Sequence, residues 1–320
     1  MDSSLDPSLQ DLLTRLRKKY DVMGQDLSSY LDGLLHADYL TYWDYIHLDT
    51  LLSLQNPKTR FPDEKVFIVY HQITELYFNL VLWELDQIAG NANLDETFFN
   101  ARLDRIIRYF ENLCSSFDIM SEGMEREQFL AFRMSLLPAS GFQSAQYRLI
   151  ELRSTDVINL VDPDSRPAMM GQPLEKLMEK LYWRSGATEL ASGKKTLTLR
   201  QFEEKYMTEF LSLASTHVTC NLLRTYEEKF EGRPNVIRRL REFDALANVH
   251  WPLSHMKSAA RYLKKDPEDI KATGGTNWQK YLPPRFQKIH FFPTLWTEVE
   301  RAEWGRAAVE KVLLKGPANQ

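Results

Sequence analysis

The chain has 320 residues, 43% hydrophobic and 26% charged, and this composition excludes a mostly disordered protein. A net charge of −4 and an isoelectric point of about 6.0 give the whole molecule no attraction to nucleic acid or to an anionic membrane. The two cysteines, Cys114 and Cys220, predict a reducing compartment and no disulfide scaffold.

The beginning of the chain has no features of a signal peptide. The segment MDSSLDPSLQDLLTRLRKKYD is acidic before it is basic and lacks a continuous apolar stretch. The longest apolar region, FIVYHQITELY at residues 67–77, is interrupted by His71, Gln72 and Glu75 well short of the ~20 apolar residues that a membrane span needs. We therefore expect a cytoplasmic protein that binds neither membrane nor nucleic acid.

Apolar residues recur at helical spacing along almost the whole chain, and the alternating patterns of strands are scarce. The longest predicted helix begins at Pro62-Asp63 and ends at Gly90, since proline and an acid are typical of a first turn and glycine of an end. We predict one all-α domain over residues 1–320, with a small helical insertion at about 155–235. The predicted helices, in chain order, cover residues 9–35, 47–55, 63–89, 95–119, 125–137, 140 to the 150s, 173–184, 198–230, 234–264 and 294–313.

His71 is a polar residue in an otherwise apolar helical stripe with Phe67 one turn before it. It can be a core histidine satisfied by hydrogen bonds, a metal ligand, or a group that handles a bound substrate. Glu75 shares its helix face and could be a second ligand, but two ligands are too few for a metal site of their own. The residues alone leave these three alternatives open.

Three further features could form a site. His255, four residues after Trp251, could bind haem iron axially because one imidazole suffices, although lone helical histidines are common. Arg133 lies in an apolar run and needs a partner, either a protein acid or a substrate carboxylate that its guanidinium binds at two points. The loop ATGGT at 272–276 could wrap a ligand but fits no phosphate-loop pattern.

Four segments together resemble the tryptophan 2,3-dioxygenase family, in an order and spacing that cover most of the chain from about residue 40. The resemblance implies an all-α, haem-binding helical bundle of the tryptophan/indoleamine dioxygenase type, with haem b as cofactor, usually assembled as a homotetramer. The four segments are YWDYIHLDTLLSLQ (42–55), DEKVFIVYHQITELYF (63–78), FRMSLLPASGFQSAQYRLIE (132–151), and WPLSHMKSAARYL with ATGGT (251–276).

The resemblance also implies a role for each matching residue. His255 would be the axial ligand of the haem iron, His71 the pocket histidine near the indole N–H, and Arg133 the clamp for the substrate carboxylate. The remaining members of the implied site are Phe67 against the indole ring, Thr273 near the substrate ammonium, Ser140 and Gly141 on the oxygen side of the haem, and Tyr42, Tyr45 and Ile46 reaching into the neighbouring subunit's pocket.

Two positions depart from the family pattern. Phe129 stands where the family has a tyrosine that assists the arginine, so one hydrogen bond worth about 0.5–1.5 kcal/mol is absent. The loop after Gly275 continues as TNW, where many members have serines and glycine. Both changes concern recognition of the amino-acid substrate or closure of the pocket.

The implied activity is insertion of O2 across the indole C2–C3 bond of L-tryptophan, which gives N-formylkynurenine. One alternative is a haem-dependent monooxygenase that adds a single oxygen atom to a tryptophan derivative and forms an oxindole in a biosynthetic pathway. A non-catalytic haem-binding protein is a further alternative, against which Arg133 argues because a sensor needs no carboxylate clamp.

Overall fold

The computed structural model describes residues 6–37, 41–136, 141–185, 187, 194–263 and 288–306. These residues form two compact units, Met1–Asn56 and Pro57–Gln320. The all-α prediction is confirmed: the described regular structure is helical, apart from one isolated bridge between Val161 and Leu181. Among the described helices, none is long and apolar enough to cross a membrane. The organisation as one domain with an insertion stays a prediction.

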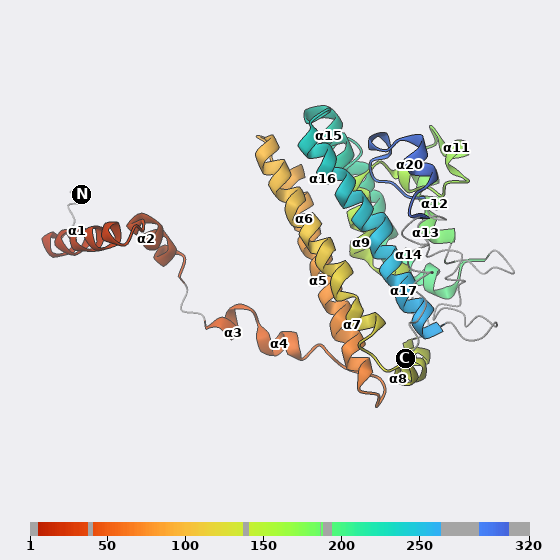
Figure 1. The fold of residues 1–320 in the computed structure, drawn as a ribbon, viewed down its shortest axis with the longest axis horizontal. Coiled ribbons are helices and arrows are strands. Elements are labelled where there is room, and N and C mark those ends of the chain that lie inside the picture. Colours follow the sequence, from red (N-terminus) through yellow and green to blue (C-terminus); the bar gives the residue numbers. More distant parts are fainter. Residues whose placement is uncertain are drawn as a thin grey trace. The chain divides into compact units, whose positions relative to one another are not determined.

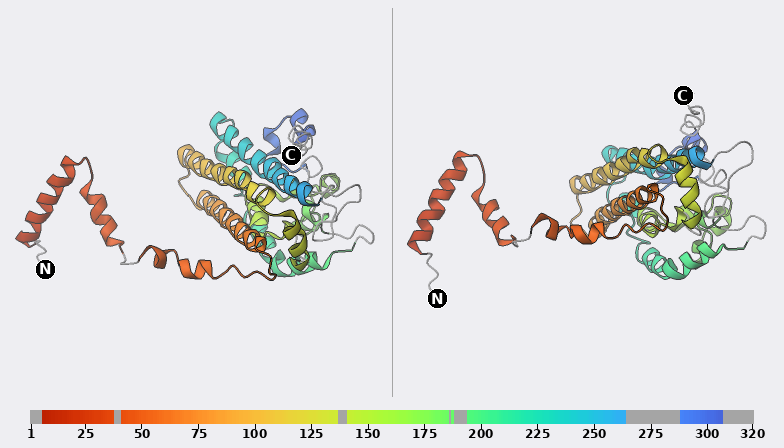
Figure 2. Two further views of the ribbon diagram at one scale, coloured as in Figure 1. Left: turned by 60° about the horizontal axis from the view of Figure 1, so that its bottom comes forward. Right: turned by 90° about the horizontal axis from the view of Figure 1, so that it is seen from below.

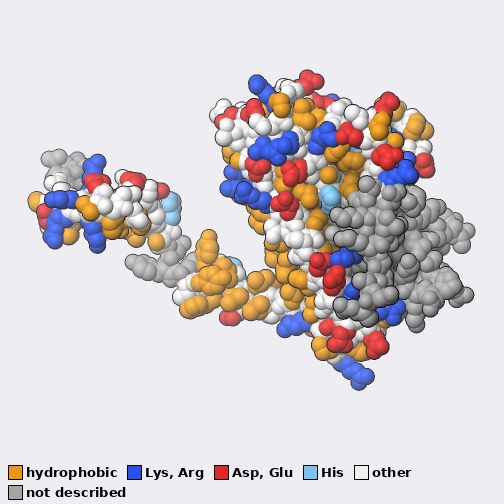
Figure 3. Space-filling view, in the orientation of Figure 1, with side chains coloured by type: hydrophobic (Ala, Val, Ile, Leu, Met, Phe, Trp, Pro, Cys, Tyr) orange, Lys and Arg blue, Asp and Glu red, His pale blue; other side chains and the backbone are white. Residues whose placement is uncertain are grey.

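The first unit consists of four helices without a core of their own. No described residue of these helices is buried, and the surface of α3 and α4 is largely hydrophobic (Figure 3). The predicted helix over 9–35 is interrupted between α1 and α2, where Gly24 has a φ of 65° that favours glycine. The helices are α1 (Pro7–Val22), α2 (Leu27–Leu35), α3 (Tyr42–Tyr45) and α4 (Leu48–Leu52).

The core of the second unit is built on four long helical segments that lie side by side (Figures 1 and 2). Helix α5 packs against α6 and α9, and α6 packs in turn against α16. Their inward faces carry aromatic and aliphatic side chains such as Phe78, Phe110 and Phe243. The segments are α5 (Asp63–Ala89), α6 (Glu96–Ser116), α9 (Ala145–Ser154), and α16 (Pro234–Ala245), which a π-helical turn (Leu246–His250) joins to α17 (Trp251–Leu263).

Further helices complete the second unit. Several of them divide segments that the sequence predicts as one helix: 198–230 is broken where Asn221 caps a new helix, and 125–137 becomes a 3-10 helix at Arg133–Leu136. The remaining helices are α7 (Asp118–Ser121), α8 (Arg126–Phe132), α10 (Val157–Leu160), α11 (Arg166–Met169), α12 (Leu174–Glu179), α13 (Tyr182–Ser185), α14 (Leu197–Thr216), α15 (Leu222–Lys229) and α20 (Glu298–Ala302), with 3-10 turns at Gly141–Gln143 and Pro293–Leu295.

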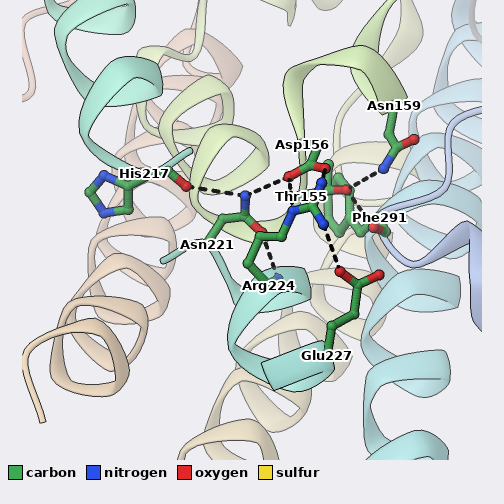
Figure 4. Close-up of polar contacts among 8 residues, drawn as sticks. All are labelled: Thr155, Asp156, Asn159, His217, Asn221, Arg224, Glu227 and Phe291. Carbon is green, nitrogen blue, oxygen red and sulfur yellow. Dashed lines mark hydrogen bonds and ion pairs between the residues drawn. The ribbon is translucent and has the colours of Figure 1, made fainter. Parts of the chain in front are cut away.

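Polar contacts around Asp156 tie α15 to the start of α10 (Figure 4). Arg224 forms a two-point ion pair with the Asp156 carboxylate, and the Asn221 amide donates to the same carboxylate at 2.9 Å. Arg224 also pairs with Glu227 at 2.9 Å. These groups bond to one another, so the contact fastens α15 to the α9–α10 corner.

Helix α5 also has an apolar stripe that the described residues leave exposed. At least 40% of the surface of each side chain in this stripe is exposed to solvent; the residues are Ile73, Leu76, Leu80 and Trp83. At about 100° per residue, these side chains lie about 120–200° around the helix from His71. The helix therefore presents an apolar face on the side away from that histidine.

Candidate active site

His71 lies on α5 with one ring nitrogen fixed. Its Nδ1 is 2.7 Å from the carbonyl oxygen of Phe67, one turn earlier, and the two ring centroids are 4.0 Å apart. A carbonyl oxygen only accepts hydrogen bonds, so Nδ1 carries the proton and Nε2 keeps its lone pair. The ring is accessible to solvent, yet the surrounding protein lowers its pKa by burial. At neutral pH this imidazole is therefore neutral.

His255 lies on α17 in an aromatic environment. Its Nδ1 is 3.0 Å from the carbonyl oxygen of Trp251, so here too Nε2 keeps the lone pair. The ring centroids of Phe117 and Trp251 lie 4.6 Å and 4.5 Å from that of the imidazole. Burial lowers the pKa of His255 to about 4, so the ring is neutral at neutral pH. A neutral imidazole with Nδ1 bonded to a carbonyl is the form in which histidine binds a metal.

The fold brings these two imidazoles into one region. The ring centroid of Tyr70 lies 6.3 Å from that of His71 and 5.7 Å from that of Phe117, and Phe117 lies 4.6 Å from His255. Two aromatic rings in contact therefore connect the imidazoles, although His71 and His255 lie on different helices far apart in the chain. The result is a pair of neutral rings, each fixed through Nδ1 by the carbonyl four residues before it.

An aromatic cluster lies beside His71. The Phe67 ring is 5.7 Å from Phe132 and 6.4 Å from Phe129, and Phe129 is 4.8 Å from Tyr262. The Tyr262 hydroxyl donates to the carbonyl oxygen of Met124 at 3.1 Å, so its proton is engaged there. The cluster gives an apolar wall suited to a flat aromatic ligand.

Arg133 follows Phe132 in the chain and begins the 3-10 helix at the end of α8. Its side chain is buried, and burial lowers its pKa from the ordinary value of 12.5. An arginine in protein nevertheless stays charged at neutral pH. A buried cation therefore follows Phe132 of the aromatic cluster in the chain. Its guanidinium group could form a bidentate ion pair with a carboxylate.

The turn at Gly141–Gln143 leads into α9. Phe142 of this turn stacks on Trp183, with ring centroids 6.0 Å apart and an interplanar angle of 10°. The cap of α9 is Ser144, which accepts the N–H of Tyr147, so the helix predicted from residue 140 begins only at Ala145.

The geometry of this region does not test five other predicted site residues. Ser140 and Thr273 lie outside the described residues. Tyr42 and Tyr45 are exposed on α3 of the first unit, and Ile46, which follows this helix, is half-buried. The roles of all five stay predictions.

The metal-ligand alternative for His71 and Glu75 does not gain support. The Gln146 amide of α9 donates to the Glu75 carboxylate and to the Glu75 carbonyl, each at 2.8 Å, so Glu75 forms a crosslink between α5 and α9. Within the described ranges, no group of three or more histidine, cysteine, aspartate or glutamate residues could hold a metal ion.

Phe117 also belongs to this region, although the sequence does not predict it. Phe117 lies in the short segment between α6 and α7, and its ring contacts both Trp251 and His255. No motif distinguishes it from the other apolar residues of the chain. Its place beside His255 depends on the packing of α7 against α17, which local sequence does not encode.

The chain matches a family model described as tryptophan 2,3-dioxygenase over residues 34–158. It is 40% identical over 277 residues to a tryptophan 2,3-dioxygenase of Anaeromyxobacter dehalogenans, covering 83% of this chain and 97% of that relative. It is 31% identical over 265 residues to a tryptophan 2,3-dioxygenase of Herpetosiphon aurantiacus, covering 80% of this chain and 96% of that relative. A third protein of this name, from a Ruegeria species, is 29% identical over 277 residues.

Proposed function

The chain belongs to the tryptophan 2,3-dioxygenase family, and on that premise we propose that it is a haem-dependent enzyme that inserts O2 across the indole C2–C3 bond of L-tryptophan. The product of this reaction is N-formylkynurenine. One observation carries the proposal: two neutral imidazoles, His71 and His255, lie in one region with their Nδ1 atoms bonded and their Nε2 lone pairs retained.

The residues around His255 fit haem b. Its Nε2 offers one lone pair, which suffices for axial ligation, and Phe117 and Trp251 supply aromatic surface of the kind that an apolar macrocycle contacts. The bound iron would supply the activation of dioxygen. The bond from Nδ1 to the Trp251 carbonyl would orient the imidazole and raise its basicity as a ligand.

His71 would accept the indole N–H of the substrate through Nε2. Burial lowers its pKa, so the ring is neutral at neutral pH and can accept this bond. Phe67, whose ring is 4.0 Å from the imidazole, would pack against the indole. The two side chains would fix the plane of the indole and thereby the position of its C2–C3 bond.

The amino-acid end of the substrate would be held at Arg133. A buried guanidinium fits a carboxylate that loses its water on binding, and Thr273 would contact the ammonium. Ser140 and Gly141 would line the oxygen side of the haem. Holding both ends of the substrate is a reason to prefer an enzyme over a non-catalytic haem protein.

The experiment that tests the proposal is an absorption spectrum of the purified protein, followed by product analysis. We expect a haem Soret band that shifts when L-tryptophan is added under reducing conditions. After admission of O2, the product mass should show two added oxygen atoms. One added oxygen would establish the monooxygenase alternative, and a protein without a Soret band would refute both.

Replacement of His71 by alanine should leave haem content unchanged and lower kcat/KM for L-tryptophan. A neutral hydrogen bond is worth about 0.5–1.5 kcal/mol, so the expected loss is roughly three- to tenfold. The loss should be smaller with 1-methyltryptophan, which has no N–H to donate. His217→Ala, at a half-buried histidine outside the site, is the matched control. Unchanged kinetics with a lowered melting temperature would make His71 a core residue.

We also propose that the protein assembles as a homotetramer in the cytoplasm. The first unit has no buried residue in its described helices, and α5 exposes the stripe Ile73, Leu76, Leu80 and Trp83. Apolar surfaces of this extent are typical of interfaces between subunits. The two free cysteines accord with a reducing compartment.

Deletion of residues 1–46 should abolish most activity and leave haem bound, because Tyr42, Tyr45 and Ile46 would complete the pocket of a neighbouring subunit. A shorter deletion, 1–37, removes α1 and α2 but keeps these three residues, and it should retain more activity. Activity and light scattering at the same concentration make the comparison. A fully active monomer, in either form, would contradict the shared site.

A further inference from the structure

The helical segment that carries His255 is not a regular α-helix. Helix α16 ends at Ala245 and α17 begins at Trp251, and between them the backbone N–H of Trp251 bonds to the carbonyl oxygen of Leu246, five residues earlier. This bonding pattern is that of a π turn, which holds one residue more than the α-helical turn that it replaces.

The π-helical turn Leu246–His250 accommodates this extra residue. A π turn within an α-helix is rare and often lies at a functional site, since it needs support from its surroundings. Without it, continuous α-helical winding would rotate Trp251 and His255 by about 100° relative to α16. The direction in which His255 points thus depends on the stability of this turn.

Two buried side chains support the π turn. The Tyr147 hydroxyl of α9 donates to the carbonyl oxygen of Ala247 at 2.8 Å. The Asn248 amide donates to the Asp244 carboxylate at 2.8 Å, across one turn of the helix. One support therefore comes from a neighbouring helix and the other from Asp244, near the end of α16.

Asp244 also holds a distant segment of the chain against this turn. Its carboxylate accepts the backbone N–H groups of Phe291 and Phe292 at 2.9 Å and 3.2 Å, and the indole N–H of Trp296 at 2.8 Å. The Thr155 hydroxyl donates to the Phe291 carbonyl on the other side (Figure 4). With Asn248, the fully buried carboxylate accepts four hydrogen bonds.

We propose that Asp244 is a positioning residue for the axial ligand: its carboxylate, together with Tyr147, holds the π turn that directs His255 into the haem pocket. This inference rests on the proposed function, because it presupposes that His255 binds the iron. A carboxylate is needed because its second oxygen accepts from both Phe292 and Trp296. An asparagine would oppose these donors with its own N–H groups.

Asp244→Asn in the haem-loaded protein tests the proposal. We expect haem to dissociate to a haem-scavenging protein at least about tenfold faster than from the wild type, since two hydrogen bonds to a buried acceptor are lost. The electron paramagnetic resonance signal of the ferric iron should become heterogeneous as the axial imidazole loses its fixed orientation. Trp296→Phe removes one donor and leaves the carboxylate, so it should give an intermediate rate if Asp244→Asn folds poorly.

Asp104→Asn is the matched control. Asp104 accepts two hydrogen bonds from Arg239 of α16, at 2.6 Å and 3.0 Å, and the described hydrogen bonds include none from Asp104 to the π turn. The Asp104→Asn variant should have a lower melting temperature than the wild type, with an unchanged haem dissociation rate and an unchanged iron spectrum. If Asp244→Asn and Asp104→Asn change these properties alike, Asp244 has only a structural role and the proposal fails.

Deletion of the exposed His250 provides a rescue. Removing one residue from the π turn lets α16 and α17 continue as one α-helix with Trp251 and His255 still inward. The double variant Asp244→Asn with His250 deleted should therefore retain haem better than Asp244→Asn alone. Equal or faster loss of haem would overturn the helical-phase argument. A wild-type protein that binds no haem would instead refute the proposed function, and the inference with it.

Discussion

Replacement of His255 by alanine should remove nearly all haem from the purified protein and leave its helical content unchanged. His255 offers the Nε2 lone pair, and its Nδ1 is bonded to Trp251, so no other atom of this side chain could replace it. Phe117 and Trp251 would still offer apolar contacts but no ligand for iron. Haem content, measured as absorbance at the Soret band per protein, should fall to a small fraction of the wild-type value while far-ultraviolet circular dichroism stays the same.

Two controls separate loss of the ligand from general damage. His217→Ala changes a half-buried histidine outside the site and should retain haem. Added imidazole should partly restore the Soret band of His255→Ala, because it can enter the space left by the missing ring. Full haem occupancy with an unchanged ferrous spectrum in His255→Ala would show that another residue is the axial ligand.

Replacement of Arg133 by alanine should weaken L-tryptophan binding by about 2–5 kcal/mol if the substrate carboxylate is desolvated and paired. Haem content should not change, because the proposed role of Arg133 is toward the substrate. Arg133→Lys keeps the charge but loses the planar guanidinium group. Its affinity for L-tryptophan should therefore lie between the affinities of the wild type and of the alanine variant. Spectral titration of the reduced protein with L-tryptophan measures all three affinities.

Tryptamine gives an independent check on this clamp. It keeps the indole and the ammonium of L-tryptophan and lacks the carboxylate. Wild type should bind tryptamine far more weakly than L-tryptophan, and Arg133→Ala should bind the two with similar affinity. Equal affinity of the wild type for both compounds would show that Arg133 is not a carboxylate clamp.

Helix α5 shows how far local sequence predicts this fold. Its predicted start at Pro62-Asp63 and its end at Gly90 agree with the observed Asp63–Ala89, because capping residues and an apolar stripe act locally. The segment 234–264 was also predicted as helical, but its π turn could not be. That turn is stabilised by Tyr147 and by the segment beginning at Phe291, both distant in the chain.

In the candidate site, too, some features follow from local sequence and others depend on residues distant in the chain. His71, Arg133 and His255 could be selected from sequence because each is a polar group in an apolar helical run and matches a family motif. The proximity of His71 to His255, the aromatic contact from Phe117 and the role of Asp244 depend on tertiary packing. A single sequence carries no local signal for such contacts.

The two faces of helix α5 constrain how this protein can evolve. His71 and the stripe Ile73, Leu76, Leu80 and Trp83 lie on one continuous α-helix with about 100° between successive residues. One residue inserted between His71 and Trp83 would rotate the stripe relative to the histidine, while substitutions leave their geometry in place. Lineages of this enzyme can therefore exchange exposed side chains along α5 without turning the stripe relative to His71, but they can change the length of the helix only where a bulge absorbs the difference, as the joint between α16 and α17 already does.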